Sequence, residues 1–305
     1  DCADSDLTPE GFGGFKLPDD ATLEFINVQG DTVATGNLEG DGTVNADGKN
    51  VAVGSDRNDT SLGDDKDFEG TIQGAAGFEK VGLGTTTFGT GADVTADSAT
   101  VSDGTLVVNT DSFVVGGGSG QFTVQDGTLG GTGDIGGNLT IGAGGTYQPG
   151  TSIGTQPVSG SLTVSGQLDI EVQPLAPLRD EGTPGTDNDL VRVADGARFA
   201  AGATIAVQED SDYSGGDSYN EGDKYYFLVS EGDDVSGLDA VRFMDDIPDY
   251  RVGDYGLTDA GTAKNGVSGT WLWFQLEPGT FYGTTRNTRA TAAMLDDAVE
   301  LGRAT

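Results

Sequence analysis

Histidine is absent from this 305-residue sequence, and cysteine occurs once, as Cys2. A serine hydrolase of the Ser-His-Asp type needs an imidazole to accept the serine proton, so that class of enzyme is excluded. Histidine is also the commonest ligand of zinc, copper and non-haem iron, and one cysteine forms neither a thiolate cluster nor an internal disulfide. We therefore expect no transition-metal chemistry. Cys2 is either a free thiol at a frayed end or half of a bridge to a segment outside this sequence.

Basic residues are scarce as well, because 15 lysines and arginines stand against 50 acidic residues, giving a formal net charge of −35. A charge of this sign repels nucleic-acid phosphates and anionic membrane surfaces. No run approaches the roughly 18 apolar residues that would span a bilayer, and the first residues lack the pattern of a signal peptide. We therefore predict no nucleic-acid partner, no membrane insertion, and a chain that is a processed or excised part of something longer.

Glycine, by contrast, is abundant, with 52 residues, and only 35% of the chain is hydrophobic. This balance favours many short strands and turns over packed helices. Short alternating runs are "TLEFINV" at 22–28, "TLVVN" at 105–109, "QFTVQ" at 121–125, "NLTIG" at 138–142 and "SLTVSGQLDIEV" at 161–172. Each has one apolar face, as in Leu162 and Val164 followed by Leu168, Ile170 and Val172, and each is too short to be stable alone. The strands must therefore stack on one another.

The turns between these strands recur in the order strand, Gly-x-Gly, strand, Gly, at residues 38–48, 127–145 and 158–167. Imperfect repeats without intervening helices are typical of a solenoid, and tight Gly/Asn corners favour a parallel β-helix. A sandwich of antiparallel hairpins is the competing fold, but the two-residue hairpin signal occurs at a single Asn-Gly pair, Asn265-Gly266. We predict an all-β, right-handed parallel β-helix whose coils bury an inward stripe.

From about residue 174 the composition changes: a Pro/Gly/Asp loop precedes longer, aromatic-rich strands, among them "KYYFLVS" at 224–230 and "TWLWFQLE" at 270–277. Trp271 and Trp273 lie on the same face of their strand because side chains alternate with a period of two. An open solenoid end exposes core and unpaired strand edges, which something must cover. We therefore interpret these strands as a hydrophobic end-cap, in preference to a ligand platform. The cap residues are Tyr225, Tyr226, Phe227, Leu228, Trp271, Trp273 and Phe274.

The last segment changes its period. Ala290, Met294, Ala298 and Leu301 fall at helical spacing, and Gly302 can end the run. The spacing predicts one amphipathic helix over about 286–301. Its narrow stripe of small residues suits a helix that is threaded through a confined space.

Three motifs resemble functional sites but fit better as turns. Residues 150–154, "GTSIG", match the G-x-S-x-G pattern that places a nucleophile such as Ser152 before a helix, yet turn formers and β residues follow here. Residues 131–136 match G-x-G-x-x-G, but the strand "NLTIG" follows in place of the helix that a dinucleotide site needs. The same stretch approaches a calcium-binding β-helix repeat, with its aspartate one residue early and no recurrence of the unit.

Acidic loops are the better candidates for a hard cation, because Ca²⁺ takes about six to eight oxygen ligands from flexible loops. The alternative for such loops is a plain solvated turn. The calcium candidates are Asp64, Asp65 and Asp67 in one loop, and Asp210, Asp212 and Asp217 in another. Paired carboxylates also perform glycosidase chemistry, but chance pairs are abundant among 50 acidic residues and nothing marks a buried pair. We expect no enzyme activity and no cofactor other than calcium.

Several stretches, in the right order, resemble one family: the C-terminal passenger region of Gram-negative type V autotransporters. Residues 68–109, which begin "FEGTIQG", resemble the passenger-associated β-helix repeat, and residues 127–166 are similar to its glycine series with a "PGTSIGT" corner. Residues 187–274 resemble the autochaperone segment. The stretch "RNTRATAAMLDDA" resembles the linker helix that enters the translocator barrel, with Asn287 at a recurrent asparagine. The sequence departs from the family pattern in its unusually acidic surface and in having no barrel after Thr305.

The resemblance implies four regions: an irregular segment at 1–20, β-helix passenger repeats at 21–173, an autochaperone cap at 174–280 and a linker helix at 281–305. It also implies export across the outer membrane of a Gram-negative bacterium to the cell surface or the medium. The implied partner is the protein's own C-terminal outer-membrane β-barrel, which this sequence lacks. The expected function is a structural stalk whose C-terminal part templates folding during secretion. Two alternatives stay open: an adhesin or self-associating surface module, and a carrier of an enzyme domain upstream of Asp1.

Overall fold

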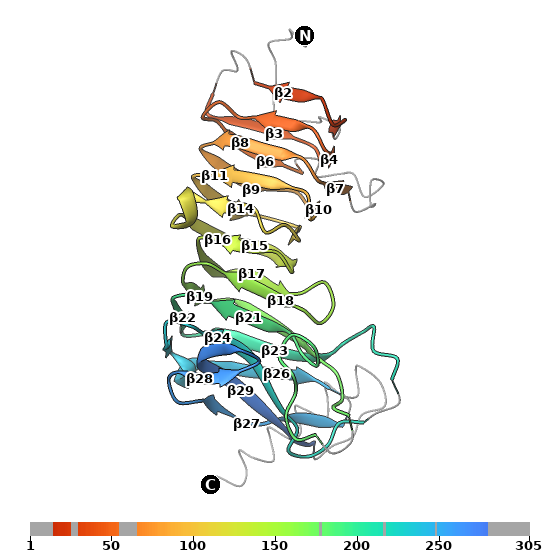
Figure 1. Cartoon of the computed structure of the whole chain (residues 1–305), viewed down its shortest axis with the longest axis vertical. Helices are drawn as coiled ribbons and strands as arrows, with labels where there is room; N and C mark the ends of the chain where they lie inside the picture. The colour runs from red at the N-terminus through yellow and green to blue at the C-terminus, as the bar shows by residue number, and fades with distance from the viewer. Residues whose placement is uncertain are drawn as a thin grey trace.

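The structure is a computed structural model, and it describes residues 15–25, 30–54, 66–176, 179–215, 218–247 and 249–279. In these residues the chain winds into a stack of coils, with the N-terminal coils at one end and the last strands at the other (Figure 1). Strands that occupy the same place in successive coils pair in parallel and form three ladders along the axis. The predicted parallel β-helix is confirmed, and the competing sandwich of hairpins is not what forms the shaft.

Each ladder takes one strand from each coil. Ladder 1 contains β1 (Phe15–Leu17), β4 (Leu38–Gly40), β7 (Lys66–Phe68), β10 (Thr85–Phe88), β13 (Thr105–Val108), β20 (Gln167–Val172), β23 (Thr204–Glu209) and β26 (Arg242–Asp246). Ladder 2 contains β2 (Thr22–Glu24), β5 (Thr43–Asn45), β8 (Thr71–Ala75), β11 (Asp93–Ala96), β14 (Phe113–Val115), β16 (Ile135–Gly136), β18 (Thr155–Val158), β21 (Leu190–Val193) and β24 (Lys224–Ser230). Ladder 3 contains β3 (Thr32–Thr35), β6 (Asn50–Val53), β9 (Gly77–Lys80), β12 (Ser98–Val101), β19 (Leu162–Val164), β22 (Gly196–Phe199) and β25 (Asp234–Ser236).

Two long strands join ladders 3 and 1 in the middle of the shaft. β15 (Gln121–Gly131) and β17 (Asn138–Pro149) each begin in ladder 3 and continue into ladder 1, with a shift of register between Val124 and Asp126. Their first parts pair with β12 and β19, and their second parts with β13 and β20. Two 3₁₀ turns, η1 (Gly116–Gly118) and η2 (Leu238–Ala240), lie between strands of the shaft.

The core of the shaft is one inward stripe, because alternate side chains of its strands point into the coil. The stripe predicted from Leu162, Val164, Leu168, Ile170 and Val172 is buried throughout. In the N-terminal half the core is aromatic, with a chain of phenylalanine contacts between ring centroids 5.3 to 6.0 Å apart. These contacts join Phe68, Phe88, Phe78, Phe113 and Phe122. Each fully buried ring stabilises the fold by about 1.5–3 kcal/mol.

Glycines make the corners where backbone passes close to the coil below. Gly131 has a φ of 114°, which favours glycine, and a Cβ there would meet the Val108 carbonyl oxygen. A Cβ at Gly133 would run into the Thr110 carbonyl oxygen in the same way. The strands β16 and β17 follow these glycines, so the G-x-G-x-x-G stretch is a corner, as predicted.

One charged side chain is enclosed at a corner near the N-terminal end. Lys80 is fully buried, and its Nζ donates hydrogen bonds to the carbonyl oxygens of Val81, 2.8 Å away, and Gly82, 2.9 Å away. A longer contact of 3.4 Å reaches the Asp103 carbonyl in the next coil. Burial lowers the pKa of Lys80 to about 8. The side chain thus ties two coils together through backbone oxygens.

The strand direction reverses at the C-terminal end. β29 (Val267–Pro278) pairs antiparallel with β24, and then with β27 (Tyr250–Leu257) on its other side. β28 (Thr262–Lys264) forms a hairpin with the start of β29. Asn265 and Gly266 connect the two with φ values of 48° and 77°, which fits the two-residue turn expected of an Asn-Gly pair. The predicted terminal helix lies outside the described residues.

Candidate functional site

The C-terminal cap is built on the antiparallel pair β24 and β29, which supplies aromatic side chains to both faces of one sheet. On the inner face, Tyr225 stacks on Phe274 with ring centroids 5.4 Å apart, and Phe227 lies 5.5 Å from the same ring. The register shifts between Tyr226 and Leu228, so Phe227 and Leu228 both reach the core. This inner group continues the hydrophobic stripe of the shaft to its last coil.

A second, smaller cluster lies on the outer face of the same strands. Its buried members are Leu190, Tyr226, Val229 and Trp271. Trp273 packs against it and is only partly buried, so both tryptophans lie on one face, as the period of two predicts. The indole Nε1 of Trp271 donates a hydrogen bond to the Thr262 carbonyl oxygen, 2.9 Å away, which ties the hairpin strand β28 to the edge of this ring.

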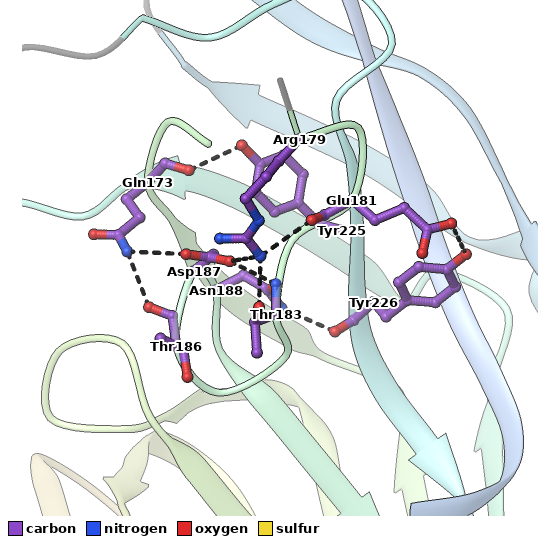
Figure 2. A network of polar contacts seen from close by, with 9 residues as sticks. All are labelled: Gln173, Arg179, Glu181, Thr183, Thr186, Asp187, Asn188, Tyr225 and Tyr226. Atoms are coloured by element: carbon purple, nitrogen blue, oxygen red, sulfur yellow. Dashed lines mark hydrogen bonds and ion pairs between the residues drawn. The ribbon is translucent and has the colours of Figure 1, made fainter. Parts of the chain in front are cut away.

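A polar network ties the loop between β20 and β21 to these aromatic residues (Figure 2). The Tyr226 hydroxyl donates to Glu181 Oε1 at 3.0 Å, and Asn188 Nδ2 donates to the Tyr226 carbonyl oxygen at 2.9 Å. The Tyr225 hydroxyl donates to the Gln173 carbonyl oxygen at 2.9 Å. The loop is therefore held by both faces of β24.

Within this loop an ion pair stabilises the turn itself. Arg179 Nη2 lies 2.6 Å from Asp187 Oδ2, and the Thr183 amide donates to the same oxygen at 2.6 Å. Burial raises the pKa of the Asp187 carboxyl, but the hydrogen bonds from Thr183 and Arg179 outweigh it and hold that pKa below its usual value. The loop is thus pinned in its ionised form.

Lys264, on the hairpin strand β28, completes the network from the other side. Its Nζ lies 3.0 Å from Glu181 Oε2 and 3.8 Å from the centroid of the Tyr226 ring. Burial opposes the charge of each group, but the hydrogen bond between them raises the pKa of Lys264 and, with Tyr226, lowers that of Glu181. A similar contact places Lys224 Nζ 3.7 Å above the Trp273 ring.

Sequence patterns singled out the aromatic residues of β24 and β29 but gave no sign of their polar partners. Glu181 and Lys264 are 83 positions apart, and neither stands in a motif. Arg179 and Asn188 lie in a loop whose composition predicts only a turn. The loop between β20 and β21 is much longer than the equivalent corner between β17 and β18, and this length is the signal that could have pointed to a role for the loop.

The structure describes three of the six calcium candidates, namely Asp67, Asp210 and Asp212. Asp67 is exposed on β7, while Asp64, Asp65 and Asp217 lie outside the described residues. Asp210 is buried, and its Oδ1 accepts hydrogen bonds from the Asp212 amide at 3.1 Å and from Ser152 Oγ at 3.2 Å. Across the described ranges no group of three or more acidic or cysteine side chains is arranged to hold a metal ion. Calcium binding stays a prediction.

Ser152 occupies a corner, and a strand follows it where a nucleophile elbow would have a helix. The bend between β17 and β18 presents its hydroxyl to Asp210, and Ser152 Oγ donates a hydrogen bond to Asp210 Oδ1 at 3.2 Å. The linker residues Asn287, Ala290, Met294, Ala298 and Leu301 lie outside the described residues.

Comparison with known proteins gives one partial match. No family model matches the chain. A stretch of 106 residues, 34% of the chain, is 38% identical to a protein of Brucella suis biovar 1 (strain 1330) described as adhesin BmaC autotransporter. The match spans only 3% of that protein's length. In the part of the chain that the structure describes, no helix has the length and apolar character needed to cross a membrane. The chain is therefore similar, over a third of its length, to an autotransporter adhesin.

Proposed function

We propose that this chain is part of a surface-displayed autotransporter passenger, a β-helical stalk whose C-terminal cap templates folding during type V secretion. The junction of β24 and β29 supports this most, because one strand pair holds both the inner aromatic group and the outer cluster around Trp271. The similarity to an autotransporter adhesin supports the passenger assignment. Its implied partner is the protein's own outer-membrane barrel, and its implied place is the cell surface.

In this mechanism the chain emerges unfolded through a narrow pore, C-terminal part first. The hairpin of β28 and β29 forms early, because its turn of Asn265 and Gly266 closes a short loop at little entropic cost. β24 then pairs with β29 and buries the aromatic side chains. Each upstream coil adds to this template by burial and strand pairing with its neighbour alone, which biases movement outward without a nucleotide.

The test compares the cap with the shaft. The double variant Trp271→Ala/Trp273→Ala removes the outer cluster, and Phe113→Ala/Phe122→Ala removes a stacked pair of the shaft core whose centroids lie 5.3 Å apart. Surface display on cells and the refolding rate of the purified chain are measured for both. We expect the cap variant to slow refolding and reduce display more than the shaft variant at an equal loss of stability. Unchanged display and refolding in the cap variant would rule out templating.

A second candidate function, adhesion by self-association, is favoured by the outer face of ladder 3. The middle of this face is uncharged and lies between Glu79, which pairs with Thr100, and Arg198, which pairs with Thr163. This uncharged face is formed by Ser98, Thr100, Gln121, Thr123, Asn138, Thr140, Ser161 and Thr163. Hydrogen bonds hold its side chains in place, from Ser161 Oγ to Asn138 Oδ1 at 2.8 Å and from Gln121 Nε2 to Thr140 Oγ1 at 3.0 Å. In a chain of net charge −35, two copies can meet here without like-charge repulsion.

Cells that display the chain provide the test of this second candidate. The variant Thr123→Asp/Thr140→Asp places charge on the uncharged face, whereas Gln73→Asp/Thr95→Asp places the same charge on exposed positions of ladder 2. If the face mediates self-association, cells aggregate with the wild type and the ladder 2 variant and disperse with the ladder 3 variant. Equal aggregation by all three, or by none, contradicts this role.

A further inference from the structure

The outer face of ladder 1 contains an elongated groove of about 530 Å³. Strands β7, β10, β13, β15, β17, β20 and β23 all contribute to it, from Asp67 at one end to Gln208 at the other. Neighbouring strands lie about 4.8 Å apart, so six spacings give a length of about 29 Å along the axis. The corner at Pro149, Gly150 and Thr151 lies along one edge. These dimensions suit an extended chain better than a compact small molecule.

The floor of the groove presents hydroxyl groups at regular intervals. Thr85 pairs in register with Thr105, and Thr105 with Thr128, so three threonines stand in one row on successive coils. Gly130 also lines the groove from β15, where it is buried and has no side chain to fill the space. The threonines present donors and acceptors together with methyl groups, which is the mixture that a sugar ring offers in return.

The side chains at the C-terminal end of the groove are fixed before any ligand arrives. Asp169 accepts hydrogen bonds from Gln148 Nε2 at 2.8 Å and from Gln167 Nε2 at 2.6 Å. Asp189 accepts hydrogen bonds from the backbone amides of Gly154, 3.0 Å away, and Glu171, 2.8 Å away. A site that is held in shape in this way loses little conformational entropy when it binds.

The charged residues that line the groove limit the class of ligand that it can bind. Among the described residues that line the groove, none is basic, whereas Asp67, Asp169, Glu171 and Asp189 are acidic. Because none of these residues is basic, a polyanion such as a uronate polymer or a nucleic acid finds no oppositely charged partner in the groove, and the net charge of −35 repels it. Burial raises the pKa of Asp189 to about 8, and burial with the neighbouring carboxylates of Asp210, Asp212 and Asp169 raises the pKa of Glu171, so both carboxyls also hold a proton more readily than usual. Carboxylates do, however, accept hydrogen bonds from neutral hydroxyl groups, and amides both donate hydrogen bonds to them and accept hydrogen bonds from them.

Backbone pairing argues against an extended peptide as the occupant. Peptides that lie along a sheet gain affinity by adding a strand to an unpaired edge. Here the groove lies on the face of ladder 1, where the backbone groups of β13, β15 and β17 already pair with neighbouring strands. Recognition must therefore come from side chains that face outward, and these are mainly hydroxyls and amides.

We propose that this groove binds an extended, neutral glycan chain, whose hydroxyl groups are read by the threonine row and by the amides and carboxylates at the C-terminal end. This function goes beyond the stalk and its folding cap and does not depend on them. The Trp271→Ala/Trp273→Ala variant leaves every groove residue in place, so loss of templating and loss of glycan binding are separate results.

The experiment measures binding of the full chain to an array of oligosaccharides. The array carries neutral hexasaccharides of glucose, mannose, galactose and N-acetylglucosamine, the hexamer of galacturonate and the hexamer of glucosamine. We expect retention on neutral chains, none on the galacturonate hexamer, and weaker retention as the chains are shortened. Failure of every neutral hexasaccharide to bind, or equal binding of galacturonate, overturns the proposal.

Variants on one strand supply a matched control. Thr128→Arg fills the groove from the second half of β15, while Gln125→Arg places the same side chain at an exposed position of that strand outside the groove. We expect the first to abolish glycan binding and the second to bind as the wild type does. If both lose binding equally while both stay folded by circular dichroism, the groove is not the site.

Two further variants settle the remaining outcomes. Thr105→Val/Thr128→Val keeps the shape and removes two hydroxyls, so we expect about tenfold weaker binding from the lost hydrogen bonds even if Thr128→Arg fails to fold. Undiminished binding by this variant contradicts the threonine row. Binding confined to glucosamine and lost in Glu171→Gln would assign a cationic ligand instead. If Thr128→Arg abolishes a dimer in sedimentation and no glycan binds, the groove is a contact between copies and the proposal fails.

Discussion

Tyr226 and Trp271 meet edge to face across the antiparallel pair β24 and β29, with ring centroids 6.3 Å apart and planes at 88°. Both rings lie outside the solenoid core, in the small cluster with Leu190 and Val229. The contact therefore joins the last parallel coil to the reversed strand without using the core that runs through the shaft.

Truncating Trp271 should cost far more stability than truncating its neighbour on the same face. Trp271 is fully buried, so Trp271→Ala is expected to lower the free energy of unfolding by about 3–5 kcal/mol. Trp273 is only partly buried and holds Lys224 above its ring, so Trp273→Ala should cost about 1–2 kcal/mol. Urea unfolding followed by circular dichroism measures both. Equal losses would show that the outer cluster is not centred on Trp271.

The contact between Glu181 and Lys264 should show a small coupling energy that salt reduces. Their side chains are 52% and 21% exposed, so solvent screens the pair. In a double-mutant cycle of Glu181→Gln and Lys264→Met we expect about 0.5–1 kcal/mol at low ionic strength. Repeating the cycle in 1 M salt should remove most of it, and a coupling that salt leaves unchanged would indicate packing of Lys264 on Tyr226 in place of charge.

The free energy of unfolding should depend on pH through two aspartates whose pKa values are shifted in opposite directions. The pKa of Asp187 is depressed, so its contribution is present above about pH 4 and is lost as pH falls through its folded-state value. Burial raises the pKa of Asp189 to about 8, so its contribution is complete below about pH 4 and is lost as pH rises towards 8. Urea midpoints between pH 3 and 9 should therefore fall on both sides of a mildly acidic maximum. Asp187→Asn should flatten the acid side and Asp189→Asn the alkaline side; a variant that left its own side unchanged would contradict the assignment.

Corner glycines should differ sharply in their tolerance of a methyl group. Gly133→Ala drives a Cβ into the Thr110 carbonyl oxygen, and we expect a loss of about 2–4 kcal/mol because backbone must move. Gly84→Ala is the control, since nothing lies within 4 Å of the added atom, and it should be neutral to within about 0.5 kcal/mol. Thermal unfolding compares the two, and a similar cost at both positions would show that close approach does not set the corner.

The two ends of the shaft should tolerate deletion differently. Each coil contacts only its neighbours, so a chain without residues 1–100 should still unfold cooperatively. A chain without residues 187–280 loses the cap and exposes the core stripe, and it should be digested quickly by proteases at native conditions. Slow digestion of the second chain, or loss of cooperativity in the first, would reverse this assignment of the stabilising end.

The parts of the fold that sequence could predict are those that repeat. The inward stripe at Leu162 and Val164 follows from alternation alone, and its direction of stacking follows from the lack of hairpin turns in the shaft. The alternation of apolar and polar residues is the same in parallel and antiparallel strands, however. The sequence therefore gave no sign of the antiparallel pairing of β29 except the Asn265-Gly266 turn. The extra residue that turns Phe227 and Leu228 to the same face is likewise invisible until the partner strand is known.

The candidate site was predictable in its aromatic half only. A tryptophan or tyrosine in a strand predicts burial because its side chain is large and mostly apolar. Nothing in the sequence distinguishes Glu181 and Arg179 from the many other charged residues in loops. Their role depends on a corner that carries them to β24 and β28, and that placement arises from contacts between distant parts of the chain. The groove of ladder 1 needed the register of its strands in the same way.

The reversed strand β29 also makes the two extremities of the solenoid unequal. At the C-terminal end, β29 runs antiparallel to β24, so another parallel coil cannot follow it, whereas the first described strand, β1, pairs in parallel with β4 as the strands of every internal coil do. Duplication or loss of a whole coil in the parallel part of the solenoid therefore leaves the C-terminal cap unchanged. Recombination among such imperfectly repeated coils would change the length of the solenoid and keep the same capped end.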